Sequence, residues 1–374
     1  MSGLPAILWT GVGLSFLYAV AAHWCFERWG RECGGGVSDA TVSFLRPLKG
    51  GVPELWEKLV LSARAMAAGD QIVLGVDAGG AEAALGERLR AAFPERDIVV
   101  VECAPGVALN PKISKLAQMS PHARHEHWVI ADSEALLEAK FVAGFRAEWM
   151  ASGADALTAG YRVCGARSWP QRLDAAAVLL TLWPGLAVLR ACGPLKITLG
   201  ACTGLRRGDL AGIGGWEMFG GELAEDNRLG AALAATGRTI RLSAHVVALE
   251  CDGLGWRDWW RHQRRVAVTY RAGNPLGFAG SIVTHGELWC VLLGVAGVRG
   301  GWAMLAVAWA LRAALAARMA RRLDFSIPTL PPVVLLASLA ASAAWLASWC
   351  ARSVWWGGKW RRVTFRGRFT GGIH

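Results

Sequence analysis

Apolar runs of strand length alternate with helical apolar repeats through the first part of the chain. The strand-like runs lie at 41–45, 71–76, 97–101 and 128–131, and helical repeats occupy 54–68 and 81–93. Strands that alternate with helices form βαβ units whose strands lie side by side and parallel. The pattern therefore predicts an α/β domain with a mainly parallel sheet, which we place at residues 38–275.

Longer apolar stretches lie at both ends of the chain. Residues 5–25 are long enough for a transmembrane anchor, and residues 278–350 contain three further apolar segments that predict a C-terminal transmembrane region. Residues 175–192 are also apolar but are broken by Pro184 and Gly185, as in a buried helix or a re-entrant or interfacial segment. A basic tail, residues 351–374, ends the chain.

Charge and composition favour a membrane surface over nucleic acid as the partner of this chain. The net charge is +11, mean hydropathy is +0.31, and there are 20 tryptophans, a residue enriched at membrane–water boundaries. Many basic residues lie beside apolar segments: Arg318, Arg321, Arg322, Lys359, Arg361, Arg362, Arg366 and Arg368. Such clusters suit anionic lipid headgroups, so we expect a lipid bilayer and no nucleic acid as partner.

The positive-inside rule, by which basic residues flank membrane segments on the cytoplasmic side, predicts the orientation of the chain in the membrane, with one conflict. Glu27, Arg28 and Arg31 follow the first apolar stretch, which predicts a cytoplasmic location for the chain beyond it. Four crossing segments would then leave the basic tail on the opposite side, against the positive-inside tendency. Either one segment is re-entrant or interfacial, or the tail tolerates that side. The nine scattered cysteines contain no C-x-x-C pair and indicate a reducing compartment.

The stretch Trp-Val-Ile-Ala-Asp-Ser-Glu at 128–134 is the main candidate for chemistry. An apolar run ends in Asp132 and Glu134, which alternate on an extended chain and so point the same way. In open α/β sheets this carboxyl edge of the strands is where ligands bind. One or two carboxylates with substrate phosphates are a usual set of Mg²⁺ ligands, so we predict a divalent metal site at Asp132 and Glu134. The alternative is a solvated strand end.

Two absent motifs and three further stretches bear on the kind of ligand that this site could bind. Neither the dinucleotide fingerprint nor the P-loop occurs, which excludes those two phosphate-binding modes. The small residues of 200–207 would allow a close approach of backbone to a ligand. Asp226 begins a predicted helix, so it is either a helix N-cap or a catalytic group. The Trp- and Arg-rich stretch 256–271 is an interfacial helix, part of the active site, or both.

Six stretches in order resemble the ceramide glucosyltransferase family, glycosyltransferase family 21, most closely its bacterial branch assigned to hopanoid biosynthesis. They are Leu-Arg-Pro-Leu-Lys-Gly at 45–50, Asn110 to Leu116, Val129 to Glu134, Gly200 to Arg207, Gly214 to Gly230, and His262 to Arg271 with 274–278. The resemblance covers about 45–285. It implies a GT-A-type nucleotide-sugar domain between N-terminal and C-terminal transmembrane helices.

The resemblance also implies roles for individual residues. Pro47, Lys49, Gly50 and Asp77 would hold the uridine nucleotide, and Lys112 would approach the diphosphate. Asp132 begins the metal-binding D-x-D motif, and Asp226 matches the catalytic base. The stretch His262, Gln263, Arg264, Arg265, Val266 aligns with a motif that contacts the donor diphosphate and the acceptor. Two residues depart from the family pattern: Glu134 replaces the second Asp, and Val266 replaces a Trp.

The sequence thus predicts an inverting, metal-dependent glycosyltransferase of a bacterial inner membrane, multi-pass, with its catalytic domain facing the cytoplasm. We expect a UDP-sugar donor, N-acetylglucosamine by the resemblance, a divalent metal (Mg²⁺ or Mn²⁺), and a membrane lipid acceptor, a hopanoid polyol. Transfer of glucose to ceramide is the first alternative. A catalytically weak membrane scaffold, suggested by the two departures, is the second.

Overall fold

The computed structural model describes residues 3–30, 38–250, 253, 255–327 and 329–371; Arg31 and residues 372–374, named above, lie outside the described residues. A seven-stranded sheet has the order β3-β2-β1-β4-β8-β6-β9. Its strands are β1 (Ser43–Pro47), β2 (Gln71–Asp77), β3 (Asp97–Cys103), β4 (His127–Ala131), β6 (Ala156–Thr158), β8 (Cys202–Arg206) and β9 (Ile240–Leu242). Only β8 is antiparallel to its neighbours. The predicted mainly parallel sheet is confirmed.

Helices cover both faces of this sheet because its strands are apolar on both sides. One core contains residues of α2 (Leu55–Ala65), α3 (Ala81–Ala92) and α5 (Ala139–Ser152). The other contains residues of α4 (Pro111–Met119), α6 (Trp169–Ala177), α7 (Trp183–Ala191) and α9 (Glu225–Ala235). A smaller sheet of β5 (Ala135–Leu136), β10 (Val247–Glu250) and β7 (Tyr161–Cys164) continues beneath β4. The remaining short helices of this region are α8 (Arg207–Gly212) and the 3₁₀ turns 120–122 and 216–219.

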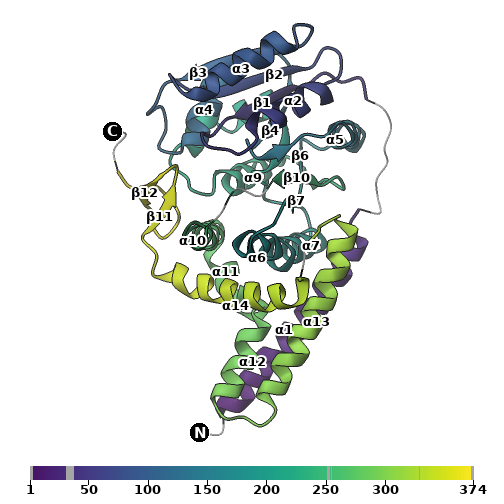
Figure 1. Ribbon diagram of the computed structural model, residues 1–374, viewed down its shortest axis with the longest axis vertical. Coiled ribbons are helices and arrows are strands. Elements are labelled where there is room, and N and C mark those ends of the chain that lie inside the picture. Colours follow the sequence, from purple (N-terminus) through teal and green to yellow (C-terminus); the bar gives the residue numbers. More distant parts are fainter. Residues whose placement is uncertain (1–2, 31–37, 251–252, 254, 328, 372–374) are drawn as a thin grey trace.

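Three long apolar elements form a bundle that extends away from the sheet (Figure 1). They are α1 (Gly3–Arg28), α13 (Gly301–Arg322), and the bent pair of α11 (Pro275–Gly280), the 3₁₀ turn 281–284 and α12 (Gly286–Val295), with a bend of 61°. Glycines allow the close packing: a Cβ on Gly11 would lie 2.4 Å from the Trp289 ring. The N-terminus lies at the far tip of the bundle, beside the α12–α13 turn.

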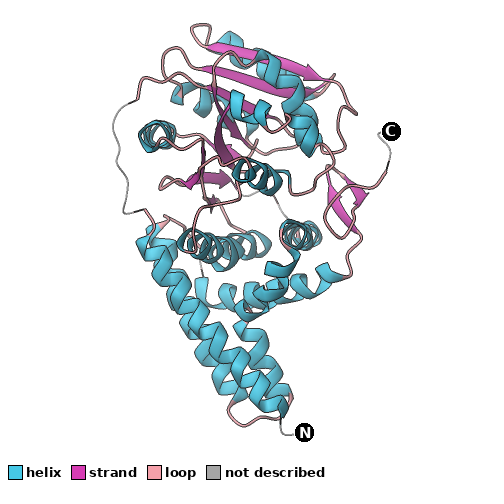
Figure 2. Cartoon of the chain, turned by 180° about the vertical axis from the view of Figure 1, so that it is seen from behind, coloured by secondary structure: helices cyan, strands magenta, loops and turns pink. Residues whose placement is uncertain are grey.

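Among the described residues, four helices are long and apolar enough to cross a membrane: α1, the α6–α7 segment, α13 and α14 (Leu330–Trp349). The bent α11–α12 pair is a fifth candidate. The α6–α7 segment is continuous across a π-helical turn, Val178–Leu182, just before Pro184. It lies under the catalytic sheet, and its α7 part packs against the C-terminal end of α1, where Phe26 contacts Trp183. Helix α14 also departs from the bundle and lies across its upper end, beneath α6 and α10 (Trp256–Gly273) (Figures 1 and 2).

The predicted basic tail is a folded element. It forms a hairpin of β11 (Ser353–Trp356) and β12 (Lys359–Arg362) and then returns along the loop before α9. Leu223 donates its backbone N–H to the Gly367 carbonyl at 2.9 Å, and Phe369 donates to the Gly221 carbonyl at 2.9 Å. We call residues 351–371 the C-terminal hairpin. Its contacts put it on the catalytic region, which a sequence pattern of scattered basic residues does not reveal.

Candidate active site

The loop after β4 is held open by a buried arginine. Arg46, on β1, is fully buried and donates from Nη2 to the carbonyls of Asp132, Ser133 and Ala135 at 3.0, 3.2 and 2.9 Å. Burial lowers the pKa of Arg46 to about 10, so the guanidinium remains charged at neutral pH. Its donors engage main-chain carbonyls, and the carboxylates of Asp132 and Glu134 pair instead with Lys112 and Lys49.

Gly200 is the point at which three predicted site residues meet. It precedes β8, whose antiparallel register with β4 pairs Ala131 with Cys202 and so brings Gly200 beside Asp132. A Cβ on Gly200 would lie 3.3 Å from Asp226 Oδ2, 3.3 Å from Lys112 Nζ and 3.5 Å from Asp132 Oδ2. A side chain there would crowd all three groups, so the small residue predicted from the sequence has a steric reason.

Lys112 joins the carboxylates of two separate elements. Its Nζ lies 2.6 Å from Asp132 Oδ1 and 3.6 Å from Glu225 Oε1, and it donates to the Gly200 carbonyl at 3.2 Å. Asn110 caps α4 by accepting from the backbone N–H of Lys112 at 2.9 Å, and its Nδ2 donates to Glu225 at 3.2 Å. This cap fixes the lysine at the first turn of α4, so its reach to the carboxylates follows from local structure.

Asp226 is the second residue of α9, and the N-cap position belongs to Ala224. The alternative interpretation of Asp226 as the helix cap is therefore wrong. Its Oδ2 accepts the Gly200 N–H at 2.9 Å and its Oδ1 accepts the Asn227 N–H at 2.7 Å. The helix can approach this closely because Gly230 has no side chain: a Cβ there would lie 2.4 Å from the Ile197 backbone. Two backbone donors thus fix the carboxylate's orientation.

Negative charge is in excess in this cluster. Burial, together with the Asp226 and Asp132 carboxylates, raises the pKa of Glu225 to about 7 despite Lys112. Burial, with the carboxylates of Glu134 and Asp226, likewise raises the pKa of Asp132 above its ordinary value. For Lys112 burial alone would lower the pKa, but the Asp132 and Glu225 carboxylates outweigh burial and raise it. The lysine is therefore a permanent cation among three acids, Asp132, Glu225 and Asp226.

Glu134 lies at the other end of the cluster. It accepts from Lys49 Nζ at 3.2 Å and from the Ser133 hydroxyl at 2.9 Å. Burial alone would raise the pKa of Glu134, but Lys49 and the Ser133 hydroxyl outweigh it and lower the pKa. In the described part of the chain, no three His, Cys, Asp or Glu side chains gather closely enough to hold a metal ion. Asp132 and Glu134 still form a hard-oxygen donor pair, which fits a divalent ion whose other ligands are phosphate oxygens.

The residues predicted to hold the nucleotide lie along the ends of β1 and β2. Pro47 pairs with Gly75, and Asp77 ends β2. Asp77 is bound by Lys115 Nζ at 2.9 Å, and the same ammonium also donates to the Leu48 carbonyl. Gly50 lies beside α3: a Cβ on it would lie 3.1 Å from the Glu82 carboxylate. These residues form the edge that continues the Lys49–Glu134 end of the cluster.

Helix α10 carries the last predicted stretch, His262 to Val266. Two of its residues, His262 and Gln263, contact α6. Gln263 donates to Asp174 of α6 at 2.8 Å, and His262 Nε2 lies 3.5 Å from the same carboxylate. Arg265 Nη2 contacts His262 Nδ1 at 3.1 Å. Burial, with the positive charges of Arg265 and Lys49, lowers the pKa of His262 to about 3, so this imidazole is neutral. The influence of Lys49 places His262 toward the nucleotide end of the cluster.

The other two predicted residues of α10 are Arg264 and Val266. Arg264 keeps a buried Nε without a hydrogen-bond partner among the described residues. Val266, which stands at the family's Trp position, is half-buried. The structure therefore brings Asp132, Lys112 and Asp226 into one cluster. It joins Lys49 to Glu134, and it ties His262 and Gln263 to α6 instead.

Several residues of the site were missed by sequence reasoning. They are Arg46, Asn110, Lys115, Asp174, Glu225 and the C-terminal hairpin. Arg46 and Lys115 stood inside stretches already singled out, and a charged residue inside an apolar strand run was an available signal for Arg46. The hairpin had no such signal. Arg368 Nε lies 2.8 Å from Glu222 Oε1, and Arg361 donates to the Leu109 carbonyl at 2.9 Å, so the hairpin supports the loops that carry Glu225 and Asn110.

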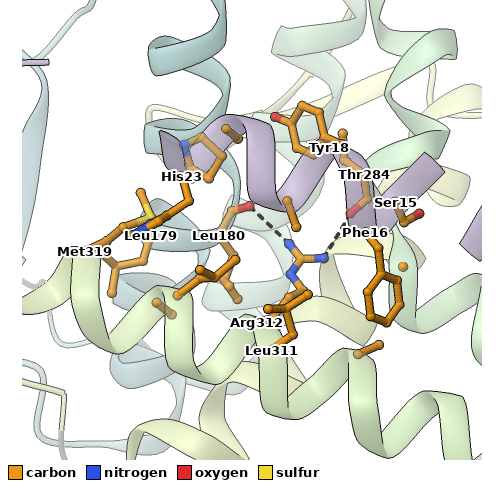
Figure 3. Close-up of a pocket in the computed structure, with 17 residues that line it drawn as sticks. Ser15, Phe16, Tyr18, His23, Leu179, Leu180, Thr284, Leu311, Arg312 and Met319 are labelled. Atoms are coloured by element: carbon orange, nitrogen blue, oxygen red, sulfur yellow. Dashed lines mark hydrogen bonds between the residues drawn. The ribbon is translucent and has the colours of Figure 1, made fainter. Parts of the chain in front are cut away.

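A separate hollow lies between the long apolar helices, away from the carboxylates (Figure 3). It holds about 590 Å³ of empty space, including its open mouth, between α1, α13 and the π-helical turn. Arg312 of α13 reaches into it and donates to the carbonyls of Thr284 and Leu180 at 2.9 and 3.2 Å and to Glu287 at 2.9 Å. Pro184 has no N–H to offer the Leu180 carbonyl four residues earlier, so Arg312 satisfies that acceptor.

Comparison with solved structures finds similar chains. A mannosyltransferase of Pyrobaculum calidifontis, solved with GDP-mannose and Mn²⁺, is 18% identical, with 92% of this chain and 99% of that chain covered and a TM-score of 0.54. TarS of S. aureus, solved with UDP-GlcNAc, is 13% identical over 89% of this chain and all of the other, with a TM-score of 0.38. The first likeness shows the GT-A-type fold.

Comparison with curated proteins found no match. The family model of glycosyl transferase family 21 matches residues 7–369, nearly the whole chain. The family resemblance expected from the six stretches is thereby confirmed, although its hopanoid branch is not. The fold, the carboxylate cluster and this match agree, and the chain belongs to glycosyl transferase family 21 and is a glycosyltransferase.

Proposed function

We propose that the enzyme transfers a sugar, with inversion, from a UDP-sugar to a hydroxyl group of a membrane lipid. The observation that carries the proposal is the convergence of Asp226, Asp132 and Lys112 on Gly200. Inverting transfer needs one base beside the acceptor and a positive environment beside the leaving diphosphate, and this cluster offers both within a few ångströms.

Asp226 is the proposed base. Its two backbone hydrogen bonds hold the carboxylate in place, and it takes the proton of the acceptor hydroxyl as that oxygen bonds to the anomeric carbon. The bond between that carbon and the diphosphate oxygen breaks in the same step. Lys112 then lies beside the departing charge, and Arg264 and Arg265 offer further donors from α10.

The nucleotide is proposed to lie along Pro47, Lys49, Gly50 and Asp77. Asp132 and Glu134 would hold a divalent ion, Mg²⁺ or Mn²⁺, which when bound supplies positive charge to the diphosphate. Excess negative charge in the cluster supports this proposal, because a divalent cation relieves repulsion among Asp132, Glu134 and Asp226. The mannosyltransferase of similar fold was solved with Mn²⁺ and GDP-mannose, so a guanosine donor is a necessary comparison.

The acceptor is proposed to be a hopanoid polyol receiving N-acetylglucosamine at the cytoplasmic face of a bacterial inner membrane. Helices long and apolar enough to cross a membrane, and the apolar hollow between α1 and α13, support a lipid acceptor. Glucosylation of ceramide is the alternative that differs only in substrates. The geometry favours neither lipid, so the experiment includes both.

The test is sugar transfer by purified membranes that contain the full chain. UDP-N-acetylglucosamine, UDP-glucose and GDP-mannose are each offered with Mg²⁺ or Mn²⁺, against bacteriohopanetetrol and ceramide. Asp226→Asn keeps one of the two hydrogen-bond acceptors but removes the base, and it should lower transfer by about 10²–10⁴-fold. Asp209→Asn, an acid of the same domain that binds Arg238, is the matched control and should remain active.

The outcomes separate the proposals. A glycolipid formed by the unmutated chain and by Asp209→Asn, but not by Asp226→Asn, supports the reaction and names its substrates. A product from GDP-mannose alone would contradict the uridine donor. No product from any pair, with no hydrolysis of any nucleotide sugar, would contradict the proposed transfer as a whole.

A further inference from the structure

The C-terminal hairpin fixes which side of the membrane the end of the chain occupies. It binds the catalytic region through the backbone pairs Leu223–Gly367 and Gly221–Phe369 and the ion pair of Arg368 with Glu222 at 2.8 Å. Residue 351 must therefore lie on the same side as the loop before α9. The chain leaves that side after Asn274, the end of α10, and must cross the membrane an even number of times before it returns.

Three apolar elements lie between those two points, so one of them does not cross. Helices α12 and α13 are an antiparallel pair packed beside α1, and their turn lies at the tip of the bundle beside the N-terminus (Figure 1). Gly301 meets the Gly294 backbone so closely that a Cβ on it would lie 2.5 Å away. This pair accounts for one passage out and one back.

Helix α14 is the element left over: it contacts the bundle at α13 and at the start of the α11–α12 pair, but it also packs on two helices outside the bundle. It lies across the bundle's upper end and packs along α10 and α6 (Figures 1 and 2). Trp345 Nε1 donates to the Phe278 carbonyl at 2.9 Å, and the Ser342 hydroxyl lies 2.9 Å from His285 Nδ1. The buried Arg271 of α10 donates to the Ser348 and Ala351 carbonyls at the helix's C-terminal end, where a cation is favoured.

Helix α14 buries its polar side chains and exposes apolar ones, the reverse of a helix on the surface of a water-soluble protein. Its serines, Ser338, Ser342 and Ser348, are buried against the protein. The outer face is an apolar stripe at helical spacing: Pro332, Leu336, Ala343 and Leu346. Leu336 is 45% and Leu346 52% exposed. A continuous apolar face of this kind on the outside of a protein requires an apolar partner.

We infer that α14 lies flat on the membrane on the catalytic side, that its apolar stripe contacts lipid, and that only α1, the α11–α12 pair and α13 cross. The bundle helices expose apolar side chains to the same degree, Leu17 of α1 at 67% and Val307 of α13 at 50%, and the exposed Arg352 follows α14 directly. Three crossings also bring the basic hairpin to the side that the positive-inside tendency favours. The inference does not depend on the sugar or the acceptor.

The first experiment measures sidedness with reporters on the full chain in a bacterial host. Green fluorescent protein and alkaline phosphatase are each fused after His374, and each is inserted in parallel into the α12–α13 turn at 297–300. Three crossings predict a fluorescent, phosphatase-inactive C-terminus and a phosphatase-active turn. An active phosphatase at the C-terminus would mean that α14 crosses and would overturn the inference.

The second experiment identifies what covers the stripe. A photoreactive amino acid replaces Leu346 on the outer face or, as the matched control, the fully buried Val334 of the same helix. After illumination of intact membranes, the Leu346 position should form adducts with the mass of a phospholipid, whereas Val334 should give only crosslinks within the chain. Adducts of Leu346 with another protein, or none with lipid, would overturn the assignment of the stripe to the bilayer.

Discussion

Two groups of buried charges in this enzyme, one at the sheet edge and one in the helix bundle, differ in their balance of positive and negative charge. At the sheet edge, three acids (Asp132, Glu225 and Asp226) lie around Lys112, and the pKa values of Asp132 and Glu225 are raised. In the bundle, Arg312 meets one acid, Glu287, which is 1% exposed, and two main-chain carbonyls, so one positive charge is paired with one negative charge. Unbalanced charge indicates a place where a charged ligand belongs, whereas balanced charge indicates a place where helices are joined.

This comparison predicts that the two groups respond differently to the loss of their cation. Lys112→Met should lower the rate of sugar transfer by about 10²–10³-fold, because a donor beside the leaving diphosphate is removed. Stability should change less, because the Asp132 side chain is a third exposed and Glu225 can take up a proton. The measurement is transfer rate and melting temperature in parallel, with Lys140→Met, an exposed lysine, as control. Full activity in Lys112→Met would contradict the site.

Arg312→Met should have the opposite pattern. It leaves the Glu287 carboxylate buried without its partner, a loss of about 3–5 kcal/mol in the free energy of unfolding. Activity per folded molecule should stay within a few-fold of the original. The double variant Arg312→Met with Glu287→Leu should regain most of the stability, because no unpaired charge remains. Thermal unfolding in detergent decides this, and a double variant no more stable than the single one would show that the pair is not the cause.

A smaller effect is expected where the C-terminal hairpin supports the catalytic loop. Gly367 has φ of +76°, and a Cβ on it would lie 2.5 Å from the Ala272 Cβ. Gly367→Ala should therefore displace the hairpin and lower kcat by about 10–100-fold through misplacement of the Asp226 loop, with KM for the donor little changed. Arg368→Gln removes the side-chain bond to Glu222 but keeps the backbone pairs and the Arg228–Glu222 contact, so it should change kcat far less. If both substitutions lowered kcat equally, the backbone pairs of the hairpin would not be what supports the catalytic loop.

The sequence could predict the features that are determined within one segment of the chain. It could not predict those that depend on contacts between distant segments. Strand runs and helical repeats predicted β1 to β4, α2 and α3 within a few residues, because each element's pattern lies within its own segment. The pairing of Asp132, Lys112 and Asp226 needed the resemblance, since three distant segments meet only through the β4–β8 register. The position of α14 was not predictable, because apolar residues alone do not distinguish a helix that crosses from one that lies flat.

The hairpin and Arg46 show the same limit at the level of single residues. Arg361 and Arg368 were counted as headgroup-binding charges, yet both bind the protein's own loops. Arg46 was quoted inside a motif with no role of its own, although it fixes the turn of Asp132 through three carbonyls. Partners that are 86 to 252 residues apart in the chain leave no pattern in the sequence around either one.

The excess of negative charge at the sheet edge also predicts a dependence of stability on pH. Glu225 has an ordinary pKa of 4.5, which burial and neighbouring carboxylates raise to about 7 in the folded protein. Between these values the folded state keeps a proton that the unfolded state has released. Stability should therefore be fully present below about pH 4.5, fall as the pH rises toward 7, and level off above that, with a slope of at most about 1.4 kcal/mol per pH unit from this group.

Glu225→Gln isolates this contribution, because Asp132 has a raised pKa of its own and adds a slope of the same sign. The variant should be less dependent on pH than the unmutated enzyme between 4.5 and 7, and Glu217→Gln, an exposed acid of the preceding loop, should not differ. Unfolding by urea at a series of pH values measures this, and parallel curves for the unmutated chain and Glu225→Gln would contradict it. Mg²⁺ should flatten the slope of the unmutated enzyme, since a cation at Asp132 and Glu134 relieves the repulsion that holds the proton on Glu225.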